Sequence, residues 1–320
     1  MNTGIRYKLL IYLCFIFVNL HSQSEWRIID TANSPLPNKW VRSITGDSVG
    51  NIWIGTYGNG LAKIDANNKW TIYDVFNSML RDDYINTLSL DGEILWIGCA
   101  YEGLQKFNYK EDKWVSYNID NSELPFNTIN CLYVADNEVY IGTESGMAIL
   151  SGDKWKVYKA GDKDINSSIV SILKVSNDSI LVVSSDKVEL YNGKRWINIS
   201  KGLKVNSSFS MAIINNNGEL LIGTFGNGIY KYNFNRKRWD VFDESIKDEM
   251  VLSMLLYEDN LYIGTNGNGF LVVNMKDKEN KKRYSKENSL LLDNWVFSIY
   301  RDISGRIWLG TTKGINVIKM

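Results

Sequence analysis

The 320-residue sequence contains one histidine, three cysteines and three prolines, and it has no excess of charge of either sign. The single histidine is His21, so residues 23–320 contain no imidazole. This absence excludes Ser-His-Asp catalysis, Cys-His catalysis and histidine-based zinc sites from those residues, because each needs an imidazole. Lys and Arg total 36, and so do Asp and Glu. The balance argues against a nucleic-acid-binding protein.

Long apolar runs are also scarce, and the one that is present lies at the N-terminus. Two basic residues precede an apolar run from Leu9 to Leu20, and a polar segment follows it. This order is typical of a secretory signal peptide, and the run is too short to span a bilayer comfortably. We predict a signal peptide at residues 1–22 and an exported chain of residues 23–320, periplasmic or secreted, with no transmembrane anchor.

Two cysteines remain in the predicted mature chain, Cys99 and Cys131. Their separation does not fit a metal-binding motif, and in an exported protein two thiols could form a disulfide. The sequence leaves open whether they pair. No metal ligand set and no cofactor is expected.

A repeated short motif, an aromatic or aliphatic residue followed by Ile or Leu and then Gly, organises the chain. The glycine position recurs at 55, 98, 142, 183, 223, 264 and 310, with Val183 in place of glycine in the fourth copy. Each copy carries four short apolar runs separated by Gly, Asn and Asp at hairpin spacing, which indicates β-strands. A four-stranded unit of about 40 to 45 residues is typical of a propeller blade. The sequence therefore predicts an all-β fold, a single seven-bladed β-propeller with four-stranded blades.

The two ends of the repeat array are expected to complete one blade. A tryptophan opens the fourth strand of most copies, and the first such residue, Trp26, precedes the first full copy. The last copy stops after its third strand, Gly314 to Lys319. We predict that the N-terminal strand around Trp26 to Ile29 completes the C-terminal blade and closes the ring, which removes the free sheet edges of an open ring.

Several copies resemble a known repeat. The segment Asn-Ser-Pro-Leu-Pro at 33–37 precedes an alternating strand at 41–44 and the segment Ile-Trp-Ile-Gly-Thr at 52–56, with echoes at 121–125 and 288–291. This order resembles the two-component regulator propeller repeat. The resemblance implies a periplasmic sensing propeller of the kind found in hybrid histidine kinases, which often detects oligosaccharide fragments. Because this chain has no kinase or receiver region, the resemblance implies a separate sensor-kinase or envelope protein as partner.

Candidate ligand-binding residues lie in the loops expected at one face of the ring. In a propeller, the loops from strand four to the next strand one share a face with the loops from strand two to strand three, and ligand sites usually lie there. Aromatic faces stack on the C–H faces of sugars, while planar polar groups bind hydroxyls. The candidates are Trp40, Tyr57, Arg81, Asp83, Tyr84, Tyr101, Glu102, Asp293 and Trp295. The alternative for Trp40 and Trp295 is that they wedge between blades.

Three functions remain open at this stage. The first is non-enzymatic ligand sensing, with oligosaccharide as the leading ligand class. The second is a protein-interaction scaffold of the cell envelope or the secretion machinery. The third is a carbohydrate-active enzyme that uses a carboxylate pair such as Asp83 and Glu102. The repeat also resembles streptogramin lyases, but these use a histidine base that residues 23–320 lack. The three Gly-Asn-Gly loops are interpreted as hairpin turns and not as phosphate or calcium sites.

Overall fold

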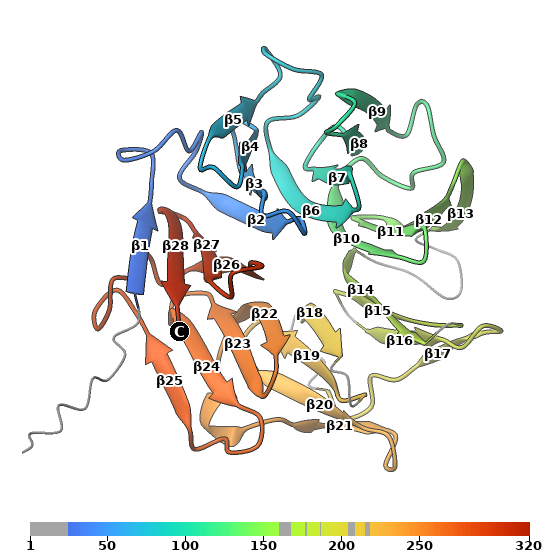
Figure 1. Cartoon of the computed structure of the whole chain (residues 1–320). Helices are drawn as coiled ribbons and strands as arrows, with labels where there is room; N and C mark the ends of the chain where they lie inside the picture. The colour runs from blue at the N-terminus through green and yellow to red at the C-terminus, as the bar shows by residue number, and fades with distance from the viewer. Residues whose placement is uncertain (1–24, 160–167, 177, 186, 204–208, 215–217) are drawn as a thin grey trace, which may run out of the picture.

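The computed structural model describes residues 25–159, 168–176, 178–185, 187–203, 209–214 and 218–320. These residues form 28 β-strands and one short 3-10 helix, η1 (Glu244–Ile246), arranged as seven four-stranded antiparallel sheets around a central axis (Figure 1). The prediction of a seven-bladed propeller is confirmed. The predicted signal peptide, residues 1–22, lies outside the described residues.

The blades follow the chain in order. Blade 1 contains β2 (Val41–Gly46), β3 (Ile52–Thr56), β4 (Leu61–Ile64) and β5 (Trp70–Tyr73). Blade 2 contains β6 (Ile85–Asp91), β7 (Ile94–Cys99), β8 (Leu104–Asn108) and β9 (Lys113–Tyr117). Blade 3 contains β10 (Ile129–Ala135), β11 (Glu138–Thr143), β12 (Gly146–Ser151) and β13 (Lys154–Lys159). Blade 4 contains β14 (Ile169–Ser176), β15 (Ser179–Ser184), β16 (Val188–Tyr191) and β17 (Trp196–Asn198).

The last three blades complete the ring. Blade 5 contains β18 (Phe209–Ile214), β19 (Leu220–Thr224), β20 (Ile229–Asn233) and β21 (Arg238–Val241). Blade 6 contains β22 (Val251–Tyr257), β23 (Asn260–Thr265), β24 (Phe270–Asn274) and β25 (Lys281–Tyr284). Blade 7 contains β26 (Val296–Arg301), β27 (Ile307–Thr311), β28 (Gly314–Lys319) and, from the other end of the chain, β1 (Glu25–Ile29).

The N-terminal strand closes the ring as predicted. Strand β1 pairs antiparallel with β28 from Glu25 opposite Lys319 to Ile29 opposite Ile315, and the two lie side by side in Figure 1. Ile29 is only 2% exposed and packs in a core cluster that spans blades 7 and 1. The first strand of the described chain is therefore part of the last blade's core.

The repeated glycine lets neighbouring blades approach closely. A Cβ atom at Gly55 would lie 2.6 Å from Cγ2 of Ile85, at the start of the next blade. The preceding aromatic, Trp53, is fully buried, and its ring centroid lies 6.0 Å from that of Phe107 and 5.2 Å from that of Tyr109, both in blade 2. The aromatic side chain therefore fills the space between two sheets that glycine allows to close up.

Each innermost strand carries a β-bulge one residue after its start. In β2, the pairing with β3 shifts register between Val41 and Ser43, so Arg42 is the extra residue. The same shift places Asn86, Asn130, Val170, Ser210, Leu252 and Phe297 at the bulges of the other blades. A bulge turns the side chain of its extra residue away from the regular alternation. These seven positions form the rim of the central channel.

Candidate functional site

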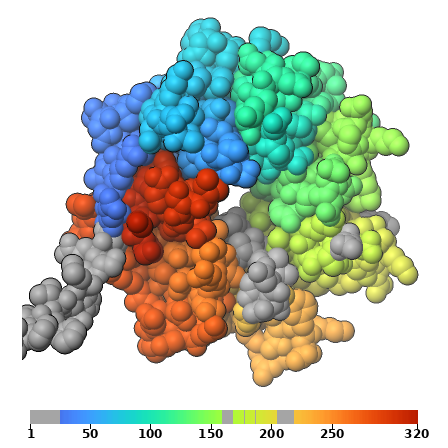
Figure 2. Space-filling view, in the orientation of Figure 1, coloured from blue at the N-terminus to red at the C-terminus, as the bar shows by residue number. Residues whose placement is uncertain are grey.

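The centre of the ring is a cavity of about 520 Å³. The hollow is visible between the blue and cyan blades, the red blade and the green blades in Figure 2. Its walls include six of the seven bulge residues: Arg42, Asn86, Asn130, Val170, Leu252 and Phe297. The seventh, Ser210, has its side chain outside the described part of the structure. The bulges therefore supply most of the chemistry that faces the channel.

A continuous series of aromatic rings extends across blades 7, 1 and 2, and one member, Phe297, lines this cavity. We call it the aromatic arc, and its members in order are Trp295, Phe297, Trp40, Tyr57, Tyr84 and Tyr101. Successive ring centroids are 6.4, 6.0, 4.8, 5.1 and 5.6 Å apart. The structure thus brings together the five aromatic residues predicted from the sequence and adds Phe297.

The backbone places the arc where two kinds of loop meet. Tyr57 follows strand β3 and forms an isolated bridge with Tyr84, which precedes β6 of the next blade. The Tyr57 N–H also donates to the Trp40 carbonyl at 2.9 Å. Three outer members of the arc keep large exposed areas, since Trp295 is 45%, Tyr84 41% and Tyr101 58% exposed. The arc therefore offers open ring surface on a fixed backbone.

Trp40 and Trp295 differ in their surroundings. Trp40 is half-buried between Tyr57 of blade 1 and Phe297 of blade 7, and its Nε1 is buried without a hydrogen-bond partner among the described residues. Trp40 thus packs between two blades, which is the alternative role predicted for it. Trp295 has nearly half of its surface exposed and so remains available to a ligand.

Arg42 was not among the predicted site residues, yet it lies beside the arc. Its guanidinium carbon is 5.5 Å from the centre of the Tyr57 ring and 5.3 Å from that of the Phe297 ring. Burial lowers the pKa of Arg42, and this effect outweighs the nearby Tyr57, which acts in the opposite direction. Tyr57 also forms a hydrogen bond with Tyr101 that raises the pKa of the Tyr101 phenol. Arg42 and the arc therefore form one connected group.

Asp83 organises its own loop. Its carboxylate accepts a hydrogen bond from the Val75 N–H at 3.1 Å, and its carbonyl accepts the N–H groups of Gly58 and Gly60, both at 3.0 Å. Burial raises the pKa of Asp83, with further increases from Asp74 and Asp82. The equivalent residues of blades 2 and 6 make the same side-chain contact through an amide, Asn127 with the Ile119 N–H and Asn294 with the Lys286 N–H. The contact therefore does not require an ionised carboxylate.

Among the described residues, the other polar candidates make no side-chain hydrogen bond or ion pair with an arc residue. The Asp293 carboxylate accepts hydrogen bonds from the Asn294 N–H at 2.8 Å and from the Thr312 hydroxyl, so it also orders a loop. Arg81 is exposed, and its backbone N–H donates to Gln105 at 2.8 Å. Glu102 is exposed in the turn between β7 and β8. The Asp83 carboxylate accepts the Val75 N–H, and no hydrogen bond joins it to Glu102 in the described part of the structure.

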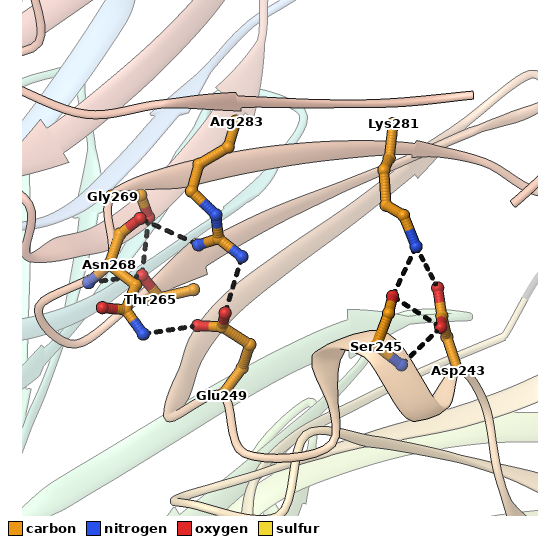
Figure 3. Close-up of polar contacts among 8 residues, drawn as sticks. All are labelled: Asp243, Ser245, Glu249, Thr265, Asn268, Gly269, Lys281 and Arg283. Atoms are coloured by element: carbon orange, nitrogen blue, oxygen red, sulfur yellow. Dashed lines mark hydrogen bonds and ion pairs between the residues drawn. The ribbon is translucent and has the colours of Figure 1, made fainter. Parts of the chain in front are cut away.

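The Gly-Asn-Gly turn of blade 6 is held by polar contacts within the protein (Figure 3). Glu249 accepts hydrogen bonds from Arg283 at 2.6 Å and from the Asn268 side chain at 3.0 Å, and Arg283 donates to the Asn268 carbonyl at 2.9 Å. Gly269 has a φ of 81°, and a Cβ there would lie 2.2 Å from the Tyr284 carbonyl. The turn is thus a hairpin that needs glycine and whose charged groups already have partners.

The remaining candidates for chemistry are few. Cys99 and Cys131 are both free thiols, so they do not pair. Among the described residues, no group of three or more His, Cys, Asp and Glu side chains could hold a metal ion. Over the same residues, no helix has the length and apolar character of a membrane span. The central cavity with its aromatic arc is therefore the principal candidate site.

These features define a seven-bladed β-propeller with an aromatic site at the rim of its channel. Residues 35–58 and 290–313, in blades 1 and 7, match the family described as "Two component regulator propeller". The two segments lie next to each other in the closed ring and include Trp40, Arg42, Trp295 and Phe297. A comparison with curated proteins finds no match.

Solved structures show the same fold at low sequence identity. The extracellular domain of a hybrid two component system from B. thetaiotaomicron aligns with a TM-score of 0.76 and 20% identity, covering 88% of this chain and 40% of that one. A second such domain from B. thetaiotaomicron aligns with a TM-score of 0.75 and 20% identity, covering 92% and 39%. The chain therefore spans about two fifths of the length of these extracellular domains. Virginiamycin B lyase from Staphylococcus aureus aligns with a TM-score of 0.75 and 13% identity, covering 93% and 100%.

Proposed function

We propose that this protein is an exported, non-enzymatic recognition propeller whose aromatic arc binds an oligosaccharide. The observation that carries the proposal is the unbroken series of six aromatic rings from Trp295 to Tyr101, with successive centroids 4.8 to 6.4 Å apart. Exposed ring faces held by a rigid backbone suit the C–H faces of sugars, because stacking there needs no rearrangement. An arc over three blades suits a ligand of several sugar units.

Polar groups at the bulges complement the arc. Asn86 of blade 2 and Asn130 of blade 3 line the cavity and offer amide groups, which donate and accept hydrogen bonds at the same time. Sugar hydroxyls need such partners once they leave water. The combination of flat apolar faces with amides therefore supports a carbohydrate ligand over a wholly apolar one.

The absence of imidazole supports recognition over catalysis. A virginiamycin B lyase variant in which one histidine is replaced by alanine is described as catalytically inactive, and this chain has no histidine after His21. Asp83, the best placed carboxylate of the enzyme alternative, takes part in ordering its own loop. Asp82 likewise orders the backbone of the arc, because its carboxylate accepts the N–H groups of Tyr84 and Tyr101.

Export and signal relay complete the proposal. The basic and apolar N-terminal segment supports secretion, and the structural likeness to extracellular domains of two component systems agrees with a sensing role outside the cytoplasm. In this proposal the state of the site is passed to another protein. We infer a sensor-kinase or other envelope protein as that partner.

The test is a glycan array followed by thermal-shift titration on residues 23–320. We expect saturable binding of an oligosaccharide, about fivefold or more weaker in Tyr84→Ala and Tyr101→Ala, since loss of a stacking ring costs roughly 1 kcal/mol or more. Both rings are exposed, so the variants should fold normally. Phe234→Ala is the matched control, because this aromatic is 53% exposed but lies between β20 and β21, outside the arc. Silence across the array would refute the proposal.

A protein-interaction scaffold is the second candidate, and exposed apolar loop residues favour it. Phe76 is 94% exposed, Met79 58% and Leu290 59%, and all three lie in loops from strand four to the next strand one. Such residues are enriched where partners dock. Cross-linking in envelope fractions should then capture a partner with the natural sequence and lose it with Phe76→Ser, while the glycan array stays silent.

A further inference from the structure

The bulge residues divide the channel rim into two halves of different chemistry. Blades 1, 2 and 3 contribute Arg42, Asn86 and Asn130, whereas blades 4, 6 and 7 contribute Val170, Leu252 and Phe297. The position is the same in every blade, so the backbone does not dictate the side chain. A ring of equivalent positions that carries different side chains is suited to set ligand specificity.

Arg42 is the one charged side chain among the described residues that line the cavity. It is partly buried, and no carboxylate in the described chain lies within ion-pair distance of it. Buried charges are usually paired, because removing them from water is costly. The rings of Tyr57 and Phe297 meet the guanidinium at 5.5 and 5.3 Å, but ring contacts do not use its N–H groups.

The neighbouring amides keep hydrogen-bonding capacity for a ligand. Asn86 uses one N–H on the Ile129 carbonyl at 3.1 Å, and Asn130 uses one on the Ser168 hydroxyl at 2.9 Å. Each amide has a second N–H and a carbonyl, and within the described residues neither group has a further partner. Arg42 and the two amides therefore present several donors on one side of the channel.

We propose that the channel rim selects an acidic sugar, with Arg42 binding the carboxylate of a uronate unit whose ring stacks on the aromatic arc. This inference rests on the proposed carbohydrate-binding function and specifies its ligand class. A guanidinium matches a carboxylate through two parallel N–H···O bonds. One guanidinium balances one carboxylate, whereas a phosphate carries nearly two charges, and the described cavity wall holds no second cation.

The experiment compares each ligand with its own neutral counterpart. Galacturonate, glucuronate and mannuronate oligosaccharides are titrated beside the same oligosaccharides after reduction of their carboxyl groups to alcohols. We expect one uronate to bind more tightly than its reduced form by a factor of roughly ten or more, since the reduced form loses a charge-assisted hydrogen bond. Arg42→Gln should abolish this difference, Arg42→Lys should keep part of it, and the exposed Arg195→Gln should leave it unchanged.

The outcomes separate this inference from the proposed function. Binding of neutral oligosaccharides that Tyr101→Ala weakens and Arg42→Gln leaves intact would overturn the inference and keep carbohydrate recognition. Preference for a sulfated over a carboxylated oligosaccharide would overturn the uronate assignment. If no glycan binds, both proposals fall. Should Arg42→Gln not fold, as judged by its melting temperature, the reduced ligand and Arg42→Lys still decide the question.

Discussion

The guanidinium of Arg42 lies 5.3 Å from the centre of the Phe297 ring, although the two residues are at opposite ends of the chain. They occupy the same bulge position in blades 1 and 7. Blade 7 is complete only when β1 pairs with β28. The candidate site therefore lies at the junction that ring closure creates, and the stability of that junction can be tested separately from ligand binding.

Ring closure predicts unequal effects of two substitutions in β1. Ile29→Ala should lower the free energy of unfolding by about 2–4 kcal/mol, because it removes buried methyl groups from a core shared by blades 7 and 1. Arg27→Ala, two residues away and exposed, should change it by less than about 0.5 kcal/mol. Urea unfolding followed by tryptophan fluorescence measures both. Equal effects would show that β1 does not contribute to the core.

The close approach of blades 1 and 2 predicts that Gly55→Ala is destabilising. The added Cβ would lie 2.6 Å from Cγ2 of Ile85, so one of the two blades must shift, at a cost of about 1–3 kcal/mol. The double variant Gly55→Ala with Ile85→Ala should lose less stability than the sum of the single variants, because the second change removes the clashing atom. Chemical denaturation of the four proteins gives the coupling free energy. A purely additive result would mean that the backbone accommodates the methyl group freely.

The strand pattern could be predicted from the sequence because each blade repeats one sequence of apolar runs and turns. The predicted strand Gly314 to Lys319 matches β28, and the predicted strand around Trp26 to Ile29 matches β1, which begins one residue earlier. Closure was predictable because the fourth-strand tryptophan, Trp26, precedes the first full copy. The strand pattern and ring closure depend on local hydrophobicity and on the number of repeat copies, and both can be read directly from the sequence.

The site was only partly predictable. Five of the six aromatic residues of the arc were found because they occupy loop positions next to strand ends. Arg42 and Phe297 were missed because each lies at a β-bulge, and the alternation of apolar residues in the sequence does not reveal a bulge. Asp83 was chosen for its charge, but only the structure shows that Asn127 makes the same contact in the next blade.

The free thiols predict slow chemical modification of the folded protein. Burial raises the pKa of Cys131 to about 12, and burial, with Asp82 and Glu102, raises the pKa of Cys99 well above its usual value. Few thiolates therefore exist at pH 8, and modification by a disulfide reagent should be slow until the protein unfolds. In a protein of residues 23–320, two thiols should then react in guanidinium chloride, and a reducing agent should not shift the melting temperature. Recovery of no thiols after unfolding would indicate a disulfide.

Asp302 predicts how stability depends on acid pH. Burial alone would raise the pKa of Asp302, but hydrogen bonds from the Trp308 indole at 2.8 Å, from the Arg306 N–H and from the Arg306 side chain outweigh burial and lower it. Because the folded-state pKa lies below the unfolded value of about 3.9, ionised Asp302 stabilises the fold above that pH. This stabilisation is lost as the pH falls through the folded-state pKa.

The substitution Asp302→Asn should therefore cost about 1–3 kcal/mol of unfolding free energy at pH 7, since it leaves charged and indole donors poorly matched. Its stability should also fall less steeply than that of the natural sequence between about pH 5 and pH 2, because one titrating carboxyl is absent. Urea unfolding at a series of pH values measures both effects, with the exposed Asp248→Asn as control. Parallel pH profiles for Asp302→Asn and the natural sequence would show that this carboxylate does not link folding to proton binding.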